Sequence, residues 1–306
     1  MPRMEIDTSQ NQPCGFLPVD KPVGPTSHDV VARVRKIFGI RQVGHTGTLD
    51  PFASGLLIIC MGKATRLSEY ILHQDKTYIF ELVLGGVSDT GDPTGHITNF
   101  KNGRRVDDVS EGEILETLTA FTGEIEQKPP LFSALKVGGK KLYKLARAGS
   151  HVTPAPRRVI IHSLRLIQFS PPGLLLEARV GAGTYIRSLG RDIGQRLNTG
   201  AYVRTLRRTA IGHLGVEGAL TPDALELHPA MALSHLLSIP DALPSWRHIV
   251  LAGKSEERLK NGNAVPWEEK PVPEGKEPFL VMNSSGDVIC VALLKRGLIQ
   301  PVKVLN

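Results

Sequence analysis

A glycine-rich loop carries the residues with the strongest chemical signature. Residues 44–55 read Gly-His-Thr-Gly-Thr-Leu-Asp-Pro-Phe-Ala-Ser-Gly, and one carboxylate, Asp50, lies between the glycines and Pro51. The apolar run at 56–61 that follows has the length and composition of a buried strand, which would give Asp50 a rigid base. A carboxylate held in this way is suited to act as a nucleophile. The residues alone also allow a structural interpretation, in which Asp50 caps the turn at Pro51 and His45 bonds to the backbone.

Signatures of several other enzyme classes are missing from the sequence. Gly62-Lys63-Ala64-Thr65 is not a phosphate loop, because Ala follows Lys63 and no glycine stands five positions before Gly62. The metalloprotease, α/β-hydrolase and dinucleotide-binding motifs do not occur either. The three cysteines are widely spaced without a Cys-x-x-Cys pair, and the ten histidines show no ligand spacing. We therefore expect no metal site and no cofactor.

Capping residues and hydrophobic spacing predict the elements that position this loop. Thr26 and Asp29 form a capping box ahead of an amphipathic run that ends at Gly39, which predicts a helix. Residues 76–84 alternate as a strand does, and Ser110 with Glu113 predicts another helix. Further strands are expected at 159–161, 164–169 and 174–180, and a further helix at 185–197. This succession indicates an α+β architecture.

Length and charge limit the class of protein. The chain has 306 residues, enough for one large domain or two moderate ones. The longest apolar run is far shorter than a membrane-spanning helix, and residues 1–15 hold no signal-peptide core, so we expect a soluble, cytoplasmic protein without membrane contact. A net charge of +7 and a pI near 9.4 favour a polyanionic partner.

Two segments are candidates for contact with such a partner. Between residues 127 and 149, clustered cations alternate with Phe132 and Tyr143, a composition suited to both phosphates and bases, although a solvated loop could have it as well. The cations are Lys136, Lys140, Lys141, Lys144 and Arg147. After a proline-bearing stretch at 239–244, short apolar runs predict a small β-rich module, so we expect domains at 1–242 and 243–306.

Several blocks of the chain together resemble the TruB family of pseudouridine synthases. They span residues 15 to about 212, and the similarity is specific because it covers many separate motifs. The blocks are Asp20-Lys21-Pro22-x-Gly24-x-Thr26-Ser27, Gly44 to Pro51, Lys76-Thr77-Tyr78, Asp89-Thr90-Gly91-Asp92-x-x-Gly95, Pro129-Pro130-x-x-Ser133-Ala134-x-Lys136, Gly183-Thr184-Tyr185-Ile186-Arg187-Ser188-Leu189 and Leu206-Arg207-Arg208-Thr209.

The resemblance implies a fold and an activity. The fold is a central mixed, mainly antiparallel sheet flanked by helices, with a basic RNA-contacting insertion at about 127–150 and a C-terminal PUA-like RNA-binding domain. The activity is the isomerisation of uridine 55 in the T loop of tRNA to pseudouridine, with the target base flipped out of the RNA. It needs no cofactor. The partner is tRNA, with no obligate protein partner, and we expect a monomer.

The resemblance also implies roles for individual residues. Asp50 is the nucleophile, Tyr78 stacks on the flipped uracil near C5, and Arg187 pairs with Asp50 and keeps it ionised. His45 takes part in the exchange that flips the base. The other substrate-contacting positions are Tyr185, Leu206 and Lys21, of which Lys21 contacts a backbone phosphate or is simply solvated. The RNA-contacting cations of the insertion are Lys136, Lys140, Lys141 and Lys144.

Two alternatives and one departure from the family pattern stay open. A related synthase that modifies ribosomal RNA within a guide-RNA complex shares the Asp50 loop but usually lacks the full insertion. A non-catalytic RNA-binding protein or tRNA-folding chaperone is the alternative from another class, and an intact set of Asp50, Tyr78 and Arg187 argues against loss of catalysis. Gly181-Ala182 stands where many relatives have a small polar and a basic residue, which puts a phosphate contact there in doubt.

Overall fold

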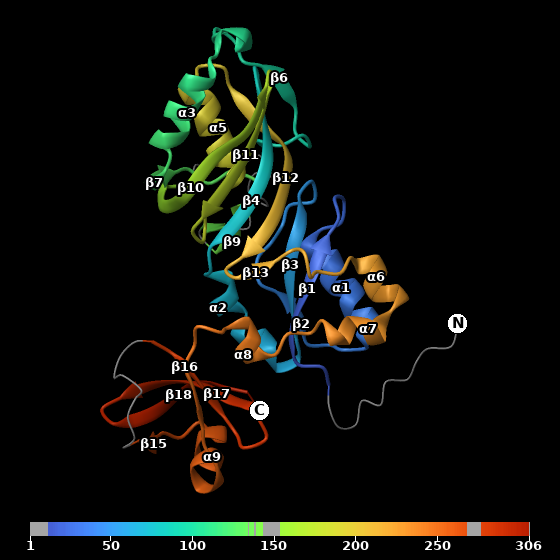
Figure 1. Cartoon of the computed structure of the whole chain (residues 1–306), viewed down its shortest axis with the longest axis vertical. Helices are drawn as coiled ribbons and strands as arrows, with labels where there is room; N and C mark the ends of the chain where they lie inside the picture. Colours follow the sequence, from blue (N-terminus) through green and yellow to red (C-terminus); the bar gives the residue numbers. More distant parts are fainter. Residues whose placement is uncertain (1–11, 134, 138, 143–153, 268–276, 306) are drawn as a thin grey trace.

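The computed structural model describes residues 12–133, 135–137, 139–142, 154–267 and 277–305. Its body is a nine-stranded sheet, and a separate five-stranded sheet forms the C-terminal part (Figure 1). The strands of the large sheet are, in order, β1 (Gly15–Lys21), β3 (Ser54–Met61), β12 (Ala201–Ile211), β4 (Lys76–Leu84), β11 (Gly173–Val180), β10 (Arg157–Ser170) and β7 (Gly123–Gln127), with β2 (Val43–His45) beside β3 and β13 (Leu214–Gly215) beside β12.

The large sheet is mixed and mainly antiparallel, as expected. Its one parallel pairing among the described strands joins β12 to β3, where Arg207 faces Ser54 and Arg208 faces Gly55. Gly55 has φ +102°, and a Cβ there would lie 2.2 Å from the Arg208 carbonyl oxygen. Only glycine therefore lets the strand behind the Asp50 loop join β12 at this point.

Five of the described helices gather in two groups. Helices α3 and α5 contact each other and strands β10 and β12 of the large sheet, whereas α1 lies with α6 and α7 near β1 (Figure 1). Short elements complete the chain. The helices are α1 (Ser27–Phe38), α2 (Ser68–Leu72), α3 (Glu111–Ala120), α5 (Ile186–Arg196), α6 (Pro222–Leu227), α7 (Pro229–Ser234), α8 (Ile239–Ala242) and α9 (Gly253–Lys260), with 3₁₀ turns at Gly62–Leu67 and Val106–Asp108 and hairpins β5 (Gly86–Ser88) with β6 (Ile97–Asn99) and β8 (Lys136–Val137) with β9 (Lys140–Lys141).

Local sequence signals predicted several of these elements correctly. The Thr26 capping box opens α1, which ends at Gly39 with φ +67°, and the Ser110 capping box opens α3. β4 has the predicted bounds, and its buried residues alternate along the first part of the strand. Two predictions were wrong in detail. The strands expected at 159–161 and 164–169 form one strand, β10, because irregular register beside β11 absorbs the break in periodicity. The loop expected from Gly44 begins later, because β2 pairs with β3 up to His45.

The C-terminal sheet is built from the short apolar runs that the sequence shows. Its strands are β14 (His248–Val250), β16 (Phe279–Met282), β17 (Val288–Lys295), β18 (Leu298–Val304) and β15 (Val265–Pro266). Leu280, Val291 and Leu305 pack in one apolar cluster with Phe16 and Ile58 of the large sheet. The two sheets therefore share buried surface.

Aromatic and polar contacts of α2 and of the 3₁₀ turn before it reinforce this junction. The Tyr70 ring lies edge-on to Trp246 with centroids 4.7 Å apart, and Lys303 Nζ lies 5.2 Å from the Tyr70 centroid. Lys303 also pairs with Glu69 at 2.5 Å and donates to the Arg66 carbonyl oxygen at 2.8 Å. Within the described ranges, no helix combines the length and apolar character needed to cross a membrane.

Candidate active site

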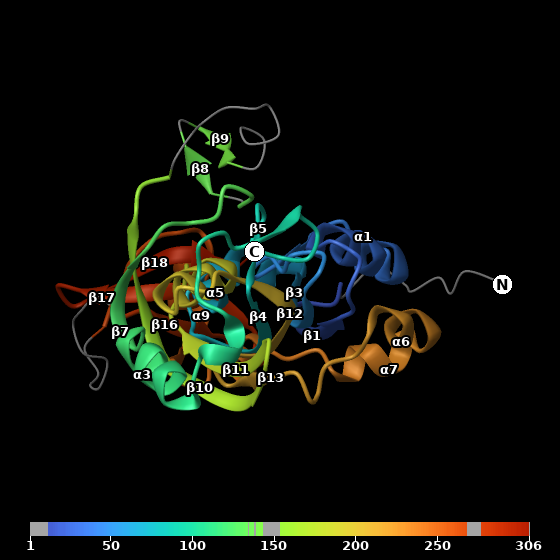
Figure 2. The ribbon, with the colours of Figure 1, turned by 90° about the horizontal axis from the view of Figure 1, so that it is seen from above.

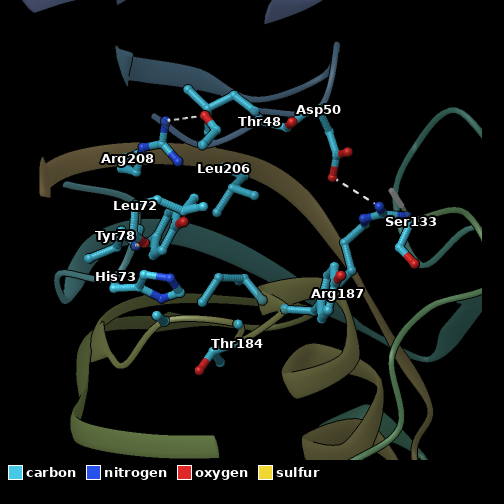
Figure 3. A pocket seen from close by; sticks show the side chains of 17 residues that line it. Thr48, Asp50, Leu72, His73, Tyr78, Ser133, Thr184, Arg187, Leu206 and Arg208 are labelled. Carbon is cyan, nitrogen blue, oxygen red and sulfur yellow. Dashed lines mark hydrogen bonds and ion pairs between the residues drawn. The ribbon is translucent and has the colours of Figure 1, made fainter. Parts of the chain in front are cut away.

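A cavity of about 420 Å³ opens beside Asp50, within the size range of small-ligand sites. Six parts of the chain form its wall: the Asp50 loop, the end of α2, strand β4, strand β12, the start of α5, and Ser133 (Figure 3). The lining residues are Gly47, Thr48, Leu49, Asp50, Leu72, His73, Lys76, Tyr78, Ser133, Ala182, Gly183, Thr184, Tyr185, Ile186, Arg187, Leu206 and Arg208. The tertiary fold thus gathers residues that lie up to 161 positions apart in the sequence.

Hydrogen bonds to its backbone fix the Asp50 loop. The buried Ser27 hydroxyl accepts from the Leu49 N–H at 2.8 Å and donates to the Leu49 carbonyl oxygen at 3.0 Å. Arg208, 1% exposed, donates to the Gly47 carbonyl oxygen at 3.1 Å and to the Leu56 carbonyl oxygen at 2.7 Å. The loop is braced on both sides of the carboxylate, so Asp50 is presented in a fixed position.

Arg187 lies against the Asp50 carboxylate from the opposite wall. Its Nη2 is 3.0 Å from Asp50 Oδ2 and its Nη1 is 3.3 Å from Asp92 Oδ2, while its side chain is only 5% exposed (Figure 3). The same guanidinium donates to the carbonyl oxygens of Thr90 at 2.8 Å and Phe132 at 2.9 Å. Four acceptors from three segments therefore hold the planar Arg187 guanidinium, and this arrangement directs it at Asp50.

Opposing influences act on the charge of Asp50. Although 34% of its side-chain surface is accessible, burial among protein atoms raises the pKa of the Asp50 carboxyl above its ordinary 3.8. The Arg187 charge opposes this rise, and the nearby Asp92 carboxylate adds to it. A desolvated carboxylate beside a cation is less well hydrated than a free one, which makes it a better nucleophile.

The predicted base-binding residues meet in the same cavity. Tyr78 on β4 and Leu206 on β12 are 8% and 7% exposed, and both line the wall across from Arg187 (Figure 3). Tyr185 lines it as well and is the residue just before α5. Gln127 fixes the Tyr185 backbone: its Nε2 donates to the Tyr185 carbonyl oxygen at 3.1 Å, and its Oε1 accepts from the Tyr185 N–H at 2.8 Å. The cavity thus joins a carboxylate to an apolar and aromatic surface, the features that a planar base would require.

Two predicted substrate contacts lie elsewhere. Lys21 is fully buried and its Nζ donates to the carbonyl oxygens of Pro22 (2.8 Å) and Pro25 (2.9 Å), so it does not reach a phosphate in this conformation. Burial lowers its pKa to about 8. The sequence could not show these contacts, because a lysine that satisfies backbone carbonyls and one that binds phosphate have the same local pattern. The ammonium instead stabilises the turn that precedes α1.

His45 lies outside the cavity lining, at the end of β2. Its Nδ1 accepts from the Gly47 N–H at 3.2 Å, and its ring meets His28 edge-on with centroids 5.3 Å apart. Burial, with the nearby His28 and Arg208, lowers the pKa of His45 to about 4, so the imidazole is neutral at physiological pH. The backbone bond considered for His45 in the structural interpretation is present.

The sequence did not single out several residues of the cavity. Arg208 and Lys76 stood in matched motifs without an assigned role, and both line the cavity, as does His73. Asp92 also stood in a matched motif; it lies outside the lining and contacts Arg187 at 3.3 Å. Lys76 Nζ donates to the carbonyl oxygens of Leu72 and, at 2.6 Å, Gln74, and burial lowers its pKa to about 8. The sequence shows that Arg208 and Lys76 are basic, but it does not show that their side chains are buried.

The basic insertion is described in part. Lys136 pairs with Lys141 in the hairpin of β8 and β9, which stands away from the body of the molecule (Figure 2). Lys140 lies in the same hairpin, whereas Lys144 and Arg147 lie outside the described residues. In the described ranges no cluster of three or more His, Cys, Asp or Glu has the arrangement of a metal site. Cys60 and Cys290 are buried, which raises the pKa of each thiol to about 12.

Comparisons with known proteins show which family this chain resembles. Residues 35–186 match the model of the TruB family pseudouridylate synthase N-terminal domain. A protein of Azoarcus sp. strain BH72 is 45% identical over 229 residues, 75% of each chain, and one of Cupriavidus metallidurans is 37% identical over 301 residues, 95% of this chain and 94% of the relative. Both relatives are named tRNA pseudouridine synthase B.

A solved structure extends the comparison to the fold. A Cbf5-Nop10-Gar1 complex contains a chain that is 25% identical, with a TM-score of 0.71, and the alignment covers 96% of this chain and 85% of that one. The alignment therefore includes the C-terminal sheet as well as the large one. With the curated relatives matched across most of both lengths, the chain belongs to the TruB family of pseudouridine synthases.

Proposed function

We propose that this chain is an isomerase that converts uridine 55 in the T loop of tRNA to pseudouridine. One observation carries the proposal: Asp50 Oδ2 lies 3.0 Å from Arg187 Nη2 at the wall of a cavity whose other side presents Tyr78 and Leu206. The relatives named tRNA pseudouridine synthase B are 37% and 45% identical, against 25% for the chain of the Cbf5-Nop10-Gar1 complex. The tRNA substrate is therefore favoured over a guide-directed one.

In the proposed reaction the N1–C1′ bond breaks, the uracil turns, C5 bonds to C1′, the C5 proton leaves to water, and N1 takes up a proton from water. Asp50 acts as the nucleophile on the sugar or the base, and Arg187 holds its carboxylate ionised and aimed. Tyr78 stacks on the flipped uracil and lies near the C5 proton. The reaction is an isomerisation without net redox change, so the residues of the chain can supply it without a metal or an organic cofactor.

The remaining assignments belong to the same proposal. Residues 1–242 form the catalytic domain with its insertion at about 127–150, and 243–306 form a PUA-like domain that adds RNA affinity. Tyr185 and Leu206 complete the base pocket, and Lys136, Lys140, Lys141 and Lys144 contact RNA phosphates. His45 would take part in flipping the target base only after its hydrogen bond with the Gly47 N–H breaks. The protein acts as a cytoplasmic monomer without an obligate partner.

Tritium release tests this function directly. Unmodified tRNA labelled at C5 of uridine loses tritium to water when pseudouridine forms, so the wild-type protein should release one equivalent per tRNA. Asp50→Asn keeps the shape of the side chain and should release none. A transcript with cytidine at position 55 controls for the target site. If the cytidine transcript releases as much tritium as the normal one, position 55 is not the target. If neither transcript releases tritium, the proposed activity is refuted.

A further inference from the structure

Ser133 lines the cavity, and its hydroxyl group has no hydrogen-bond partner. The residue is 5% exposed, and its Oγ has no hydrogen bond. Unpartnered buried side-chain polar atoms occur at four described residues, and of these only Ser133 lines the cavity. Proteins rarely leave a buried hydroxyl unpaired, because such a group has lost water without replacing it. A group kept in that state beside a reactive carboxylate is a candidate ligand contact.

The chain before Ser133 is held firmly in place. Gln127 makes two hydrogen bonds to the Tyr185 backbone, and the Lys128 carbonyl oxygen accepts from the Ser188 hydroxyl at 2.8 Å. Arg187 then holds the Phe132 carbonyl oxygen at 2.9 Å. These contacts tie the segment to the start of α5 at both ends. The Ser133 hydroxyl is therefore preorganised, and rotation about its Cα–Cβ bond is enough to redirect it.

The position of Ser133 relative to Asp50 indicates which part of a substrate it faces. One nitrogen, Arg187 Nη2, lies 3.0 Å from Asp50 Oδ2 and 2.9 Å from the oxygen of the residue just before Ser133. In Figure 3 Arg187 lies between Ser133 and Tyr78. If the uracil stacks on Tyr78 and C1′ lies at Asp50, then Ser133 is on the side of the sugar and its phosphates, away from the base.

We propose that Ser133 binds the flipped nucleotide by donating its hydroxyl proton to an oxygen of the sugar–phosphate backbone beside the reacting C1′. The acceptor is the ribose 2′-oxygen or an adjoining phosphate oxygen. This inference rests on the proposed function, because it places a nucleotide in the cavity. It gives the cavity a polar contact on the side of Asp50 that Tyr78 and Leu206 leave uncovered.

The test uses Ser133→Ala in the full-length protein, with Ser188→Ala as the structural reference. Without RNA, Ser133→Ala should keep the wild-type Tm, because the oxygen it removes has no partner, whereas Ser188→Ala loses a formed bond and should melt earlier. With tRNA at saturating enzyme, Ser133→Ala should lower the single-turnover rate about tenfold, the size of one lost hydrogen bond. A wild-type control that forms pseudouridine keeps this test separate from the test of the function itself.

Two modified substrates identify the acceptor. A target 2′-deoxyuridine should slow the wild type but not Ser133→Ala any further if the acceptor is the 2′-oxygen. If the acceptor is a phosphate, an uncharged methylphosphonate beside the target should slow the wild type but should not slow Ser133→Ala any further. The proposal is overturned if Ser133→Ala reacts within twofold of wild type, or if it melts as early as Ser188→Ala. If Ser133→Ala loses tenfold in rate and both modified substrates still slow it further, the contact is with the base, and the proposal is overturned as well.

Discussion

Replacing Arg187 by lysine tests the geometry of the site most sharply. The arginine holds Asp50 at 3.0 Å, Asp92 at 3.3 Å and two backbone carbonyl oxygens with one planar fork. A lysine ammonium keeps the charge but is a single point with three donors, so it cannot reach all four acceptors. At least one bond to a charged group is lost, which costs about 1.5–3 kcal/mol.

A loss of that size corresponds to about 10- to 140-fold in rate, at about 1.4 kcal/mol per factor of ten, and a misplaced reacting group can by itself cost about 100-fold. We therefore expect Arg187→Lys to lower the single-turnover rate at saturating enzyme by at least ~100-fold, with little change in tRNA affinity. Arg191→Lys is the matched control, because Arg191 lies one turn along α5, is 43% exposed and pairs with its neighbour Asp192. Such a surface pair is worth about 0–1 kcal/mol, so that variant should react normally.

The pH profile separates loss of aim from loss of charge. Burial raises the Asp50 pKa and Arg187 holds it down, so the acid limb of the wild-type rate profile should lie above pH 3.8. Arg187→Lys should lower the plateau with little shift of this limb, because the charge remains. Arg187→Met removes the charge, so the Asp50 pKa rises further and the limb should move to higher pH. If Arg187→Lys reacts within threefold of wild type, the fork does not aim Asp50.

Other predictions address the nucleophile, the insertion and the C-terminal part. Asp50→Ala should abolish turnover while tRNA affinity stays within about tenfold, roughly 1.4 kcal/mol, and pseudouridine formed by a clean preparation would contradict this. Neutralising Lys136, Lys140, Lys141 and Lys144 together should flatten the log–log salt dependence of binding by about 0.7–0.9 per lost phosphate contact, whereas an unchanged slope would mean that the insertion makes none. Removing residues 245–306 should weaken tRNA binding more than it slows the saturated single-turnover rate. Because Leu280 and Val291 share a buried cluster with Phe16, an unchanged melting profile must first show that the shortened protein is folded; a collapsed rate in a folded truncation would refute the prediction.

The sequence by itself determined several local elements and singled out Asp50 as the candidate nucleophile. Capping boxes at Thr26 and Ser110 determine α1 and α3 because the bonds that start a helix are made within four residues. Alternation defines β4 for a similar reason, since a strand with one buried face must repeat every second residue. The glycine-rich loop, followed by an apolar strand, marked Asp50 without any long-range information. The short apolar runs after residue 245 likewise predicted a β-rich C-terminal module.

Only the tertiary structure decided which way the charged side chains face. Lys21, Lys76 and Arg208 look like any surface cation in the sequence, yet the fold buries each and pairs it with backbone carbonyl oxygens. The second carboxylate on Arg187, from Asp92, and the unpartnered Ser133 hydroxyl also depend on segments that meet only after folding. The physical reason is the range of the interactions: capping and periodicity act within a few residues, whereas burial and pairing of charge depend on which distant strand or helix arrives at the same place.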